Sequence, residues 1–297
     1  MKKVFILAIV FIIAVVIDIV VEFKEEIMPK KPIIKIASVE KQIDKQLPPP
    51  LQTEQNISKV RTQTPEVIQL VREGNASIDL SQVSPLINQE TQEQICSNDH
   101  SIYKCMSRMN LSLGDEIFIR IFKLTAELEV WVKSNDYYEL LRIFPICKQS
   151  GYLGPKLKEG DKQGPEGFYS VTKNSLNPNS KYHLAFNLGF PNSYDRLHNR
   201  TGSALMIHGD CISMGCYAIG DEKIEEIYQL VEKALDSGQK EVQVHIFPFR
   251  MTEDIMLEYS NNEWYNFWGN LKEGYDYFEE SSIPPKVSVV NRRYEFE

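Results

Sequence analysis

The sequence predicts a mainly β domain of the α+β class, preceded by an N-terminal membrane anchor and a polar tether. Beyond residue 115, apolar and polar residues alternate in short runs, which is typical of strands. One segment beyond residue 220 instead has apolar residues at helical spacing. Because strands and helices do not alternate regularly, we do not expect the parallel sheet of an α/β protein.

The first 22 residues are predicted to form a signal-anchor segment. Lys2 and Lys3 precede an apolar run over 4–21 that only Asp18 interrupts. At ~1.5 Å per residue, this run nearly spans a hydrocarbon core of ~30 Å. No small-x-small cleavage site follows it, and no cysteine precedes Cys96 to accept a lipid, so we favour an uncleaved anchor over a cleaved signal peptide. The protein is then expected in the cell envelope or periplasm, held in the inner membrane.

Residues 23–100 are predicted to form a flexible tether, and residues 101–297 the folded domain. The tether segment is rich in Gln, Glu and Lys, contains Pro48, Pro49 and Pro50, and has few apolar residues with which to bury a core. The formal net charge of the chain is −8. A surplus of negative charge provides no basic surface for a phosphate backbone, so nucleic acid is not expected as a partner.

Several short strands and one long helix are expected in the folded domain. The helix begins at Asp221, whose side chain can cap it, and ends before Gly238. The aromatic cluster over 264–268 is interpreted as core rather than as a sugar-binding surface. The expected strands cover residues 116–123, 127–133, 137–145, 182–188, 203–207, 241–247 and 286–290.

The segment 207–217, with the sequence IHGDCISMGCY, holds the residues that most clearly suggest chemistry. His208 follows an expected strand and Cys216 closes the next loop, so a base and a thiol can face each other. Gly215 has no side chain to block a substrate carbonyl, and the backbone N–H groups of Gly215 and Cys216 can form an oxyanion hole. The segment therefore predicts Cys216 as a nucleophile and His208 as its base.

Three other interpretations of this segment stay open on the sequence. Cys211 is a rival nucleophile, although its neighbours Asp210 and Ile212 are bulky. Zinc is a second alternative, but the segment lacks the C-x2-C spacing of recognised structural sites; the ligands would be His208, Asp210, Cys211 and Cys216. In the third, Cys211 and Cys216 form a disulfide or remain inert thiols, and His208 is merely hydrogen-bonded.

The chain has five cysteines. Disulfides persist outside the cytosol, and an odd count leaves at least one thiol unpaired within the chain. A single free nucleophile and two disulfides are the simplest division. The pairing of the remaining cysteines cannot be deduced from their spacing; they are Cys96, Cys105, Cys147 and Cys211.

Three blocks of the folded domain match a known family. They are LEVWV at 128–132, GDKQGPEGFY at 160–169, and HG at 208–209 together with SMGC at 213–216. With these blocks, residues 115–297 resemble the YkuD-type L,D-transpeptidase catalytic domain, in its YafK-like branch. The resemblance implies a YkuD-like β-sandwich or sheet domain with a long helix after the cysteine.

The resemblance also implies a reaction. Cys216 would be the nucleophile, His208 its base, and Ser213 a hydrogen-bonding partner of that histidine. In the family, the thiolate attacks the carbonyl at the L-centre of meso-diaminopimelate in a peptidoglycan stem peptide, and an amine or water resolves the thioester. We therefore expect stem peptides, and a protein attached to the wall, as partners, and no metal or cofactor. Release by water is slightly favoured over transfer to an amine.

Two positions depart from the usual pattern of the family. Met214 stands where most members have histidine and Ala218 where they have arginine, so a substrate carboxylate lacks an evident partner. We hypothesise that Arg196 or Arg200 provides it, because a guanidinium can grip a carboxylate through two hydrogen bonds. Otherwise both arginines lie on a solvated loop. The alternative function is a module that binds peptidoglycan without catalysis.

Overall fold

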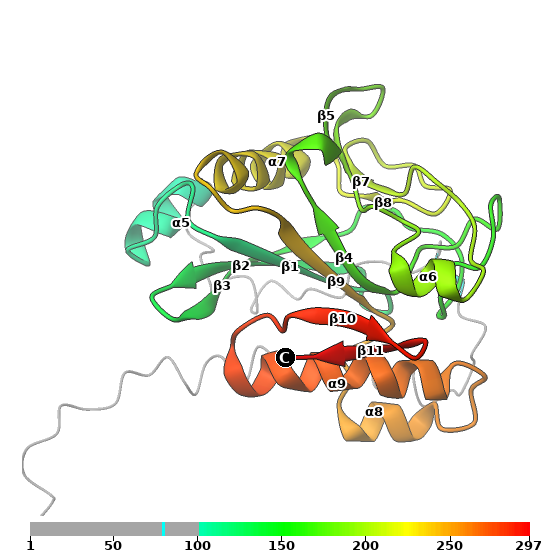
Figure 1. Cartoon of the computed structure of the whole chain (residues 1–297). Helices are drawn as coiled ribbons and strands as arrows, with labels where there is room; N and C mark the ends of the chain where they lie inside the picture. Colours follow the sequence, from blue (N-terminus) through cyan, green and yellow to red (C-terminus); the bar gives the residue numbers. More distant parts are fainter. Residues whose placement is uncertain (1–78, 81–100) are drawn as a thin grey trace, which may run out of the picture. The chain divides into compact units, whose positions relative to one another are not determined.

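The computed structural model describes residues 79–80 and 101–297 (Figure 1). The predicted anchor, residues 1–22, and most of the predicted tether, residues 23–100, lie outside the described residues and stay predictions. Within the described ranges, no helix is both long enough and apolar enough to cross a membrane. The described chain is α+β with mixed sheets, as the sequence predicts.

A five-stranded mixed sheet forms the centre of the fold. Its strands are β1 (Ile117–Phe122), β2 (Glu127–Ser134), β3 (Tyr137–Pro145), β4 (Gly167–Val171) and β9 (Val242–Phe247). They lie in the order β3-β2-β1-β9-β4. The first three form an antiparallel meander, while β1 runs parallel to β9 after the chain has left the sheet and returned.

A second sheet and a long helix cover one face of the central sheet. The second sheet consists of β5 (Leu176–Ser180), β6 (His183–Asn187), β7 (Met206–His208) and β8 (Tyr217–Ala218), in that order. The predicted helix is confirmed as α7 (Asp221–Asp236), and it contacts strands of both sheets. The predicted cap was wrong: the N-cap residue is Gly220, and the Asp221 carboxylate instead accepts from the Asp210 N–H. Aliphatic side chains from both sheets, from α7 and from α5 (Ile102–Arg108) form one core cluster there.

Aromatic residues fill the opposite face of the central sheet. Two helices, α8 (Glu253–Glu258) and α9 (Tyr265–Ser281), and the hairpin of β10 (Val287–Val290) and β11 (Arg293–Phe296) pack on this side (Figure 1). Trp268 of α9 is fully buried there, which confirms the interpretation of the 264–268 cluster as core.

Because both faces are covered, β1 is buried along its whole length. Ile119 and Ile121 point into the aliphatic cluster, whereas Arg120 between them points to the aromatic side. The Arg120 guanidinium lies 2.8 Å from Glu129 and 2.6 Å from Glu279, which compensates its charge. Burial alone would raise the pKa of Glu129, but the neighbouring guanidinium groups hold it at about 2.

One residue of the predicted tether is packed on the domain. Leu80 is only 1% exposed, and it lies among side chains of the aromatic cluster. Its N–H donates to the Gly151 carbonyl over 2.9 Å. The expectation of a flexible tether therefore does not hold at Leu80. The few apolar residues around Leu80 are scattered without a regular period, so the sequence does not indicate this docking.

Candidate active site

His208 ends the short strand β7, which lies between β6 and β8. Its Nδ1 is 2.6 Å from the carbonyl oxygen of Gly209. A carbonyl oxygen only accepts hydrogen bonds, so Nδ1 carries the proton, and Nε2 of the neutral ring keeps a free lone pair. The ring also stacks on Tyr182, with ring centroids 4.7 Å apart. These contacts fix the ring and leave Nε2 as the basic nitrogen.

Cys216 directly precedes β8. In the parallel β7–β8 pair, Ile207 lies opposite Tyr217, and both belong to the aliphatic core. Side chains alternate along a strand, so the adjacent residues His208 and Cys216 both point to the other side of the pair. The thiol donates to the Ala204 carbonyl, with 3.6 Å between Sγ and the oxygen. The strand register thus brings the predicted base and the predicted nucleophile to one face.

The surroundings of the two residues favour their neutral forms. Burial lowers the pKa of His208, although its backbone hydrogen bond and the charge of Asp210 act in the opposite direction. Burial raises the pKa of the Cys216 thiol, and the Met206 amide and the Lys156 charge oppose this only in part. The resting pair is therefore a neutral thiol with a neutral imidazole. Such a thiol needs a base in position before it can act as a nucleophile.

A disulfide holds the loop between the two residues. Cys211 is bonded to Cys147, with the Cα atoms 5.4 Å apart and a sequence separation of 64. Next to it, the backbone of Lys148 pairs with that of Ala218, through N–H to oxygen distances of 3.1 and 3.0 Å. The segment that follows β3 is therefore attached to the nucleophile loop both covalently and by hydrogen bonds.

The disulfide removes the alternatives that involved Cys211. Cys211 has no thiol, so it is neither a rival nucleophile nor a thiolate ligand for zinc, and it is not bonded to Cys216. Cys216 is the free cysteine of the described residues. Cys105 is disulfide-bonded as well, and Cys96 lies outside the described residues.

Gly215 has a backbone conformation and a close packing that disfavour a side chain. Its φ of 113° lies in the region that glycine tolerates best, and a Cβ there would lie 3.1 Å from the Gln163 carbonyl oxygen. Its N–H donates to the Ser150 Oγ over 2.8 Å and to the Ser213 Oγ over 3.2 Å. The N–H that we expected to face a substrate is therefore already hydrogen-bonded. Nothing in the sequence motif pointed to Ser150, which belongs to a distant segment.

Ser213 does not make the contact that the resemblance implied. Its hydroxyl donates to the Cys216 carbonyl over 2.7 Å, and within the described residues His208 is instead held by the Gly209 carbonyl. Ser213 thus supports the backbone of the nucleophile, whereas the orientation of the histidine is set by its own neighbour. A sequence motif fixes which residues are near one another but not which hydrogen bonds they choose.

The two candidate arginines lie in different environments. Arg200 is buried, with its guanidinium 2.9 Å from Asp195 and 4.7 Å from the ring of Phe267. It therefore holds the loop to α9, and little of its guanidinium is exposed. Arg196, on the short helix α6 (Ser193–Leu197), is exposed and donates to the Pro191 carbonyl. Of the pair, Arg196 is the accessible one.

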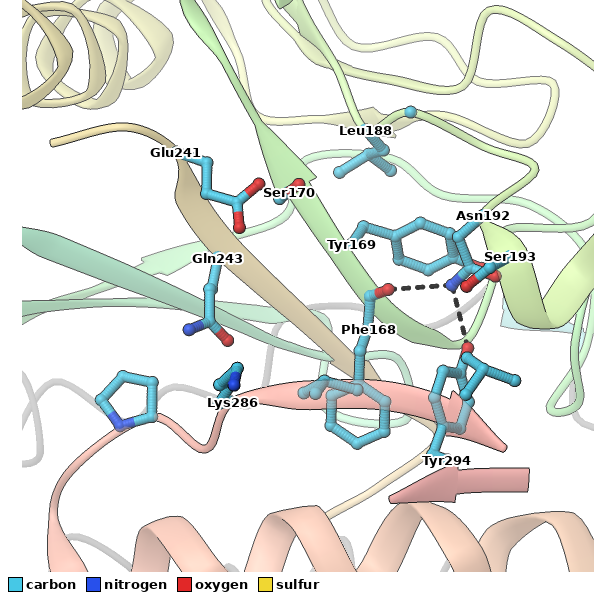
Figure 2. A pocket seen from close by; sticks show the side chains of 14 residues that line it. Phe168, Tyr169, Ser170, Leu188, Asn192, Ser193, Glu241, Gln243, Lys286 and Tyr294 are labelled. Atoms are coloured by element: carbon cyan, nitrogen blue, oxygen red, sulfur yellow. Dashed lines mark hydrogen bonds between the residues drawn. The ribbon is translucent and has the colours of Figure 1, made fainter. Parts of the chain in front are cut away.

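A cavity of about 390 Å³ lies between β4, β9 and the β10–β11 hairpin (Figure 2). Ser170, Glu241, Gln243 and Lys286 contribute polar groups to its lining, and Asn192 bonds to the Phe168 carbonyl at its edge. None of the residues predicted for the site lines this cavity. The thiol and the imidazole belong instead to the loops around β7 and β8.

No family model matches the chain. A curated protein of Escherichia coli strain K12, named "Putative L,D-transpeptidase YafK", is 52% identical over 182 residues, which cover 61% of this chain and 74% of that protein. The protein of the same name from Escherichia coli O157:H7 matches to the same extent. The chain belongs to the YkuD-type L,D-transpeptidase family. Within that family it is a member of the YafK-like branch, as its motifs predict.

Solved structures are similar at a lower level. The helical cell shape determining protein Pgp2 from Campylobacter jejuni is 17% identical, with a TM-score of 0.37, over 64% of this chain and 81% of that chain. Bd1075 from Bdellovibrio bacteriovorus is 17% identical, with a TM-score of 0.33, over 62% of this chain and 83% of that chain.

Proposed function

We propose that this protein is a cell-envelope cysteine enzyme that transfers acyl groups of peptidoglycan stem peptides through a thioester on Cys216. The proposal rests mainly on one arrangement, the free thiol of Cys216 and the unprotonated Nε2 of His208 on one face of the β7–β8 pair. Membership of the L,D-transpeptidase family supports the reaction class. The resemblance supplies the scissile bond, at the L-centre of meso-diaminopimelate.

In the first half of the reaction, Nε2 of His208 takes the proton from the Cys216 thiol as the sulfur attacks the substrate carbonyl. A carbon–sulfur bond forms and the carbonyl oxygen becomes an oxyanion, for which the backbone N–H of Cys216 is our candidate donor. When the carbon–nitrogen bond breaks, the imidazolium returns its proton to the leaving amine. The products are a thioester on Cys216 and a free amine.

In the second half, His208 takes a proton from the incoming amine or water, which attacks the thioester, and then returns it to the departing sulfur. Ser213 supports the Cys216 carbonyl during both halves. Arg196, the accessible arginine, is our candidate partner for a substrate carboxylate. With water as acceptor, a peptide or attached protein is released. With an amine, a cross-link or a new attachment is formed.

The proposed location is the outer side of the inner membrane, with residues 4–21 as the anchor. The Cys147–Cys211 disulfide supports a location outside the cytosol, because disulfides there are not reduced by the glutathione pool. Membership of the L,D-transpeptidase family is consistent with an enzyme that acts on peptidoglycan in the cell envelope. A protease-protection experiment on spheroplasts, in which only an outer domain is digested, tests this location.

Mass spectrometry of muropeptides distinguishes the two outcomes. Sacculi are incubated with the wild-type protein, with Cys216→Ala, and with Cys211→Ala together with Cys147→Ala as a control that keeps the nucleophile. Products that lose an attached peptide and gain water indicate a hydrolase, and products that gain a cross-link or an amine indicate a transpeptidase. If the products do not depend on Cys216, the proposed reaction is wrong.

The alternative is a module that binds peptidoglycan without catalysis. It predicts that Cys216→Ser binds sacculi and supports function as well as the wild-type protein does. Our proposal predicts that this variant keeps sacculus binding in a pull-down but releases or transfers nothing. Equal function of the two proteins in cells would favour the binding module.

A further inference from the structure

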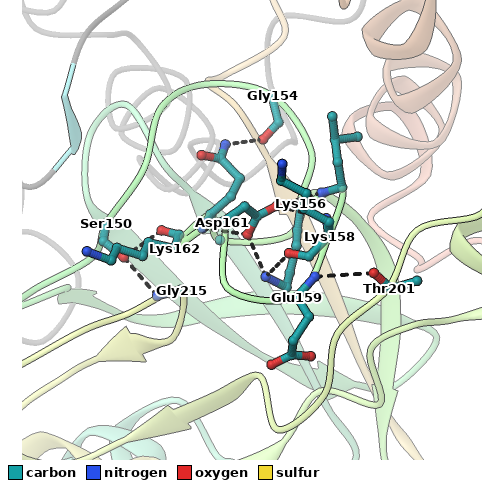
Figure 3. A network of polar contacts seen from close by, with 12 residues as sticks. Ser150, Gly154, Lys156, Lys158, Glu159, Asp161, Lys162, Thr201 and Gly215 are labelled. Carbon is teal, nitrogen blue, oxygen red and sulfur yellow. Dashed lines mark hydrogen bonds and ion pairs between the residues drawn. The ribbon is translucent and has the colours of Figure 1, made fainter.

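Both ends of one loop contact Gly215, the residue before the nucleophile Cys216. This loop, residues 150–163, leaves the fold after the Lys148–Ala218 bridge and returns before β4. Its first residue, Ser150, accepts the Gly215 N–H over 2.8 Å (Figure 3). Its last residue, Gln163, places its carbonyl oxygen close to Gly215, since a Cβ built there would lie 3.1 Å from it. Both ends of the loop therefore contact Gly215.

The hydrogen bonds of Ser150 determine the direction of its lone pairs. Its hydroxyl donates to the Lys162 carbonyl over 2.8 Å, so its single proton is used within the loop (Figure 3). The lone pairs of Oγ are then free to accept the Gly215 N–H. Ser213 Oγ lies 3.3 Å from Ser150 Oγ and donates to the Cys216 carbonyl. It also accepts the Gly215 N–H, over a longer distance of 3.2 Å, so Ser150 is the nearer of two acceptors. The serine pair thus supports the backbone on both sides of the peptide group that joins Gly215 and Cys216.

The loop that carries Ser150 is itself held in a single shape. The Gln163 side chain accepts from the Tyr152 N–H and donates to the Tyr152 and Gly154 carbonyls. Asp161 accepts from the N–H groups of Leu157 and Lys158, over 2.9 Å in each case. Side chains whose hydrogen bonds are all satisfied within a compact loop make that loop a firm support.

The base of the same loop is fixed in the protein core. The buried Lys123 donates to the Gly154 and Gly164 carbonyls and pairs with Glu166 at 2.9 Å. Glu166 in turn accepts from the Trp268 indole of α9. The loop that carries Ser150 is therefore held by the core as well as by its contacts with the loop that contains Cys216.

We propose that Ser150 is a positioning residue for the thioester reaction. By holding the Gly215 N–H, it fixes the Met214–Gly215 peptide group and so restrains the next one, Gly215–Cys216, which carries the Cys216 N–H, the backbone donor closest along the chain to the attacking sulfur. This inference rests on the proposed function. Loss of an oxyanion donor costs about 10²- to 10³-fold in kcat, and loosening one that remains present should cost about 10-fold or more. Substrate binding does not involve the bond and should be unchanged.

Ser150→Ala, Ser150→Thr and a matched control test this role. Ser170→Ala is the control, because Ser170 is also half-buried and its hydroxyl makes no hydrogen bond within the described residues. With a disaccharide tetrapeptide as substrate, Ser150→Ala should lower kcat about 10-fold or more and leave KM within about twofold. Ser150→Thr, which keeps the hydroxyl, and Ser170→Ala should stay within about threefold of wild type. A fall that appears in KM, or an equal fall in Ser150→Thr, would overturn the assignment.

A second readout is independent of activity. Hydrogen exchange of the Gly215 amide, followed by NMR in the full-length protein, should be about 10-fold faster in Ser150→Ala than in wild type and unchanged in Ser170→Ala. Unchanged exchange at Gly215 in Ser150→Ala would overturn the proposed contact whatever the kinetics show. If the wild-type protein makes no product, the proposed reaction fails, and the positioning role fails with it even where Gly215 exchange is accelerated.

Discussion

Removal of the Cys147–Cys211 disulfide tests how the nucleophile loop is held. The change is the double variant Cys147→Ser with Cys211→Ser. Both half-cystines are exposed, so the substitution leaves no cavity in the core and no buried group without a partner. Its effect should therefore come mainly from the unfolded chain, which gains freedom when the cross-link is lost.

The magnitude follows from the length of chain that the disulfide closes. For a sequence separation of 64, the loss of loop-closure entropy corresponds to about 4 kcal/mol at 25 °C. For a domain of this size, that loss lowers Tm by about 8–16 °C. Local hydrogen bonds such as those between Lys148 and Ala218 keep the native loop in place, so the variant should still fold.

Urea unfolding followed by tryptophan fluorescence measures the difference in the free energy of unfolding. Cys216→Ser is the control, because it removes a cysteine without opening a cross-link, and it should stay within about 0.5 kcal/mol of wild type. A loss of less than about 1 kcal/mol in the double variant, at an unchanged m value, would refute the reasoning from chain entropy.

Other predictions concern buried and exposed groups outside the loop. Burial lowers the pKa of His245 well below its ordinary value, so only the unfolded chain binds a proton there as the pH falls below 6.5. Between about pH 7 and about pH 5, the free energy of unfolding measured in urea should therefore fall more for wild type than for His245→Phe. Equal losses in the two proteins would contradict this. Leu80→Ala should lose about 2–4 kcal/mol in urea unfolding because the side chain is fully buried, whereas an undocked segment would show no loss. Arg200→Met should lower the free energy of unfolding by about 3–5 kcal/mol, since it leaves Asp195 buried without its partner. Arg196→Ala should raise KM for muropeptides with little change in stability, and an unchanged KM would remove Arg196 from the site.

Four of the five central strands could be predicted from their runs of apolar or alternating residues, but β4 was not among the expected strands. β1 is almost continuously apolar, β2 alternates with period two, and a short turn joins β2 to β3. β8 contains only two residues, too few for any pattern. The helix α9 has buried residues at helical spacing, but Gly269 and Gly274 weaken the signal. Gly274 is required by packing, because a Cβ there would lie 2.7 Å from the Phe168 ring.

The candidate site could be predicted only where it is local in sequence. His208 and Cys216 belong to one short segment, so their spacing already suggested the pair. Ser150 and the disulfide partner Cys147 approach that segment from a distant part of the chain, and no spacing rule relates them. Arg200 could not be separated from Arg196 on the sequence, because only tertiary packing determines which guanidinium is buried.

The most direct measurement is the mass of the enzyme during turnover. Protein incubated briefly with a disaccharide tetrapeptide is quenched in acid, digested and examined for an adduct. Our account predicts that the peptide containing Cys216 gains the mass of the acyl part of the substrate, and that this mass is lost after hydroxylamine treatment, as expected of a thioester. His208→Ala should form the adduct much more slowly. An adduct on another residue, or product formation without any adduct at Cys216, would contradict the account.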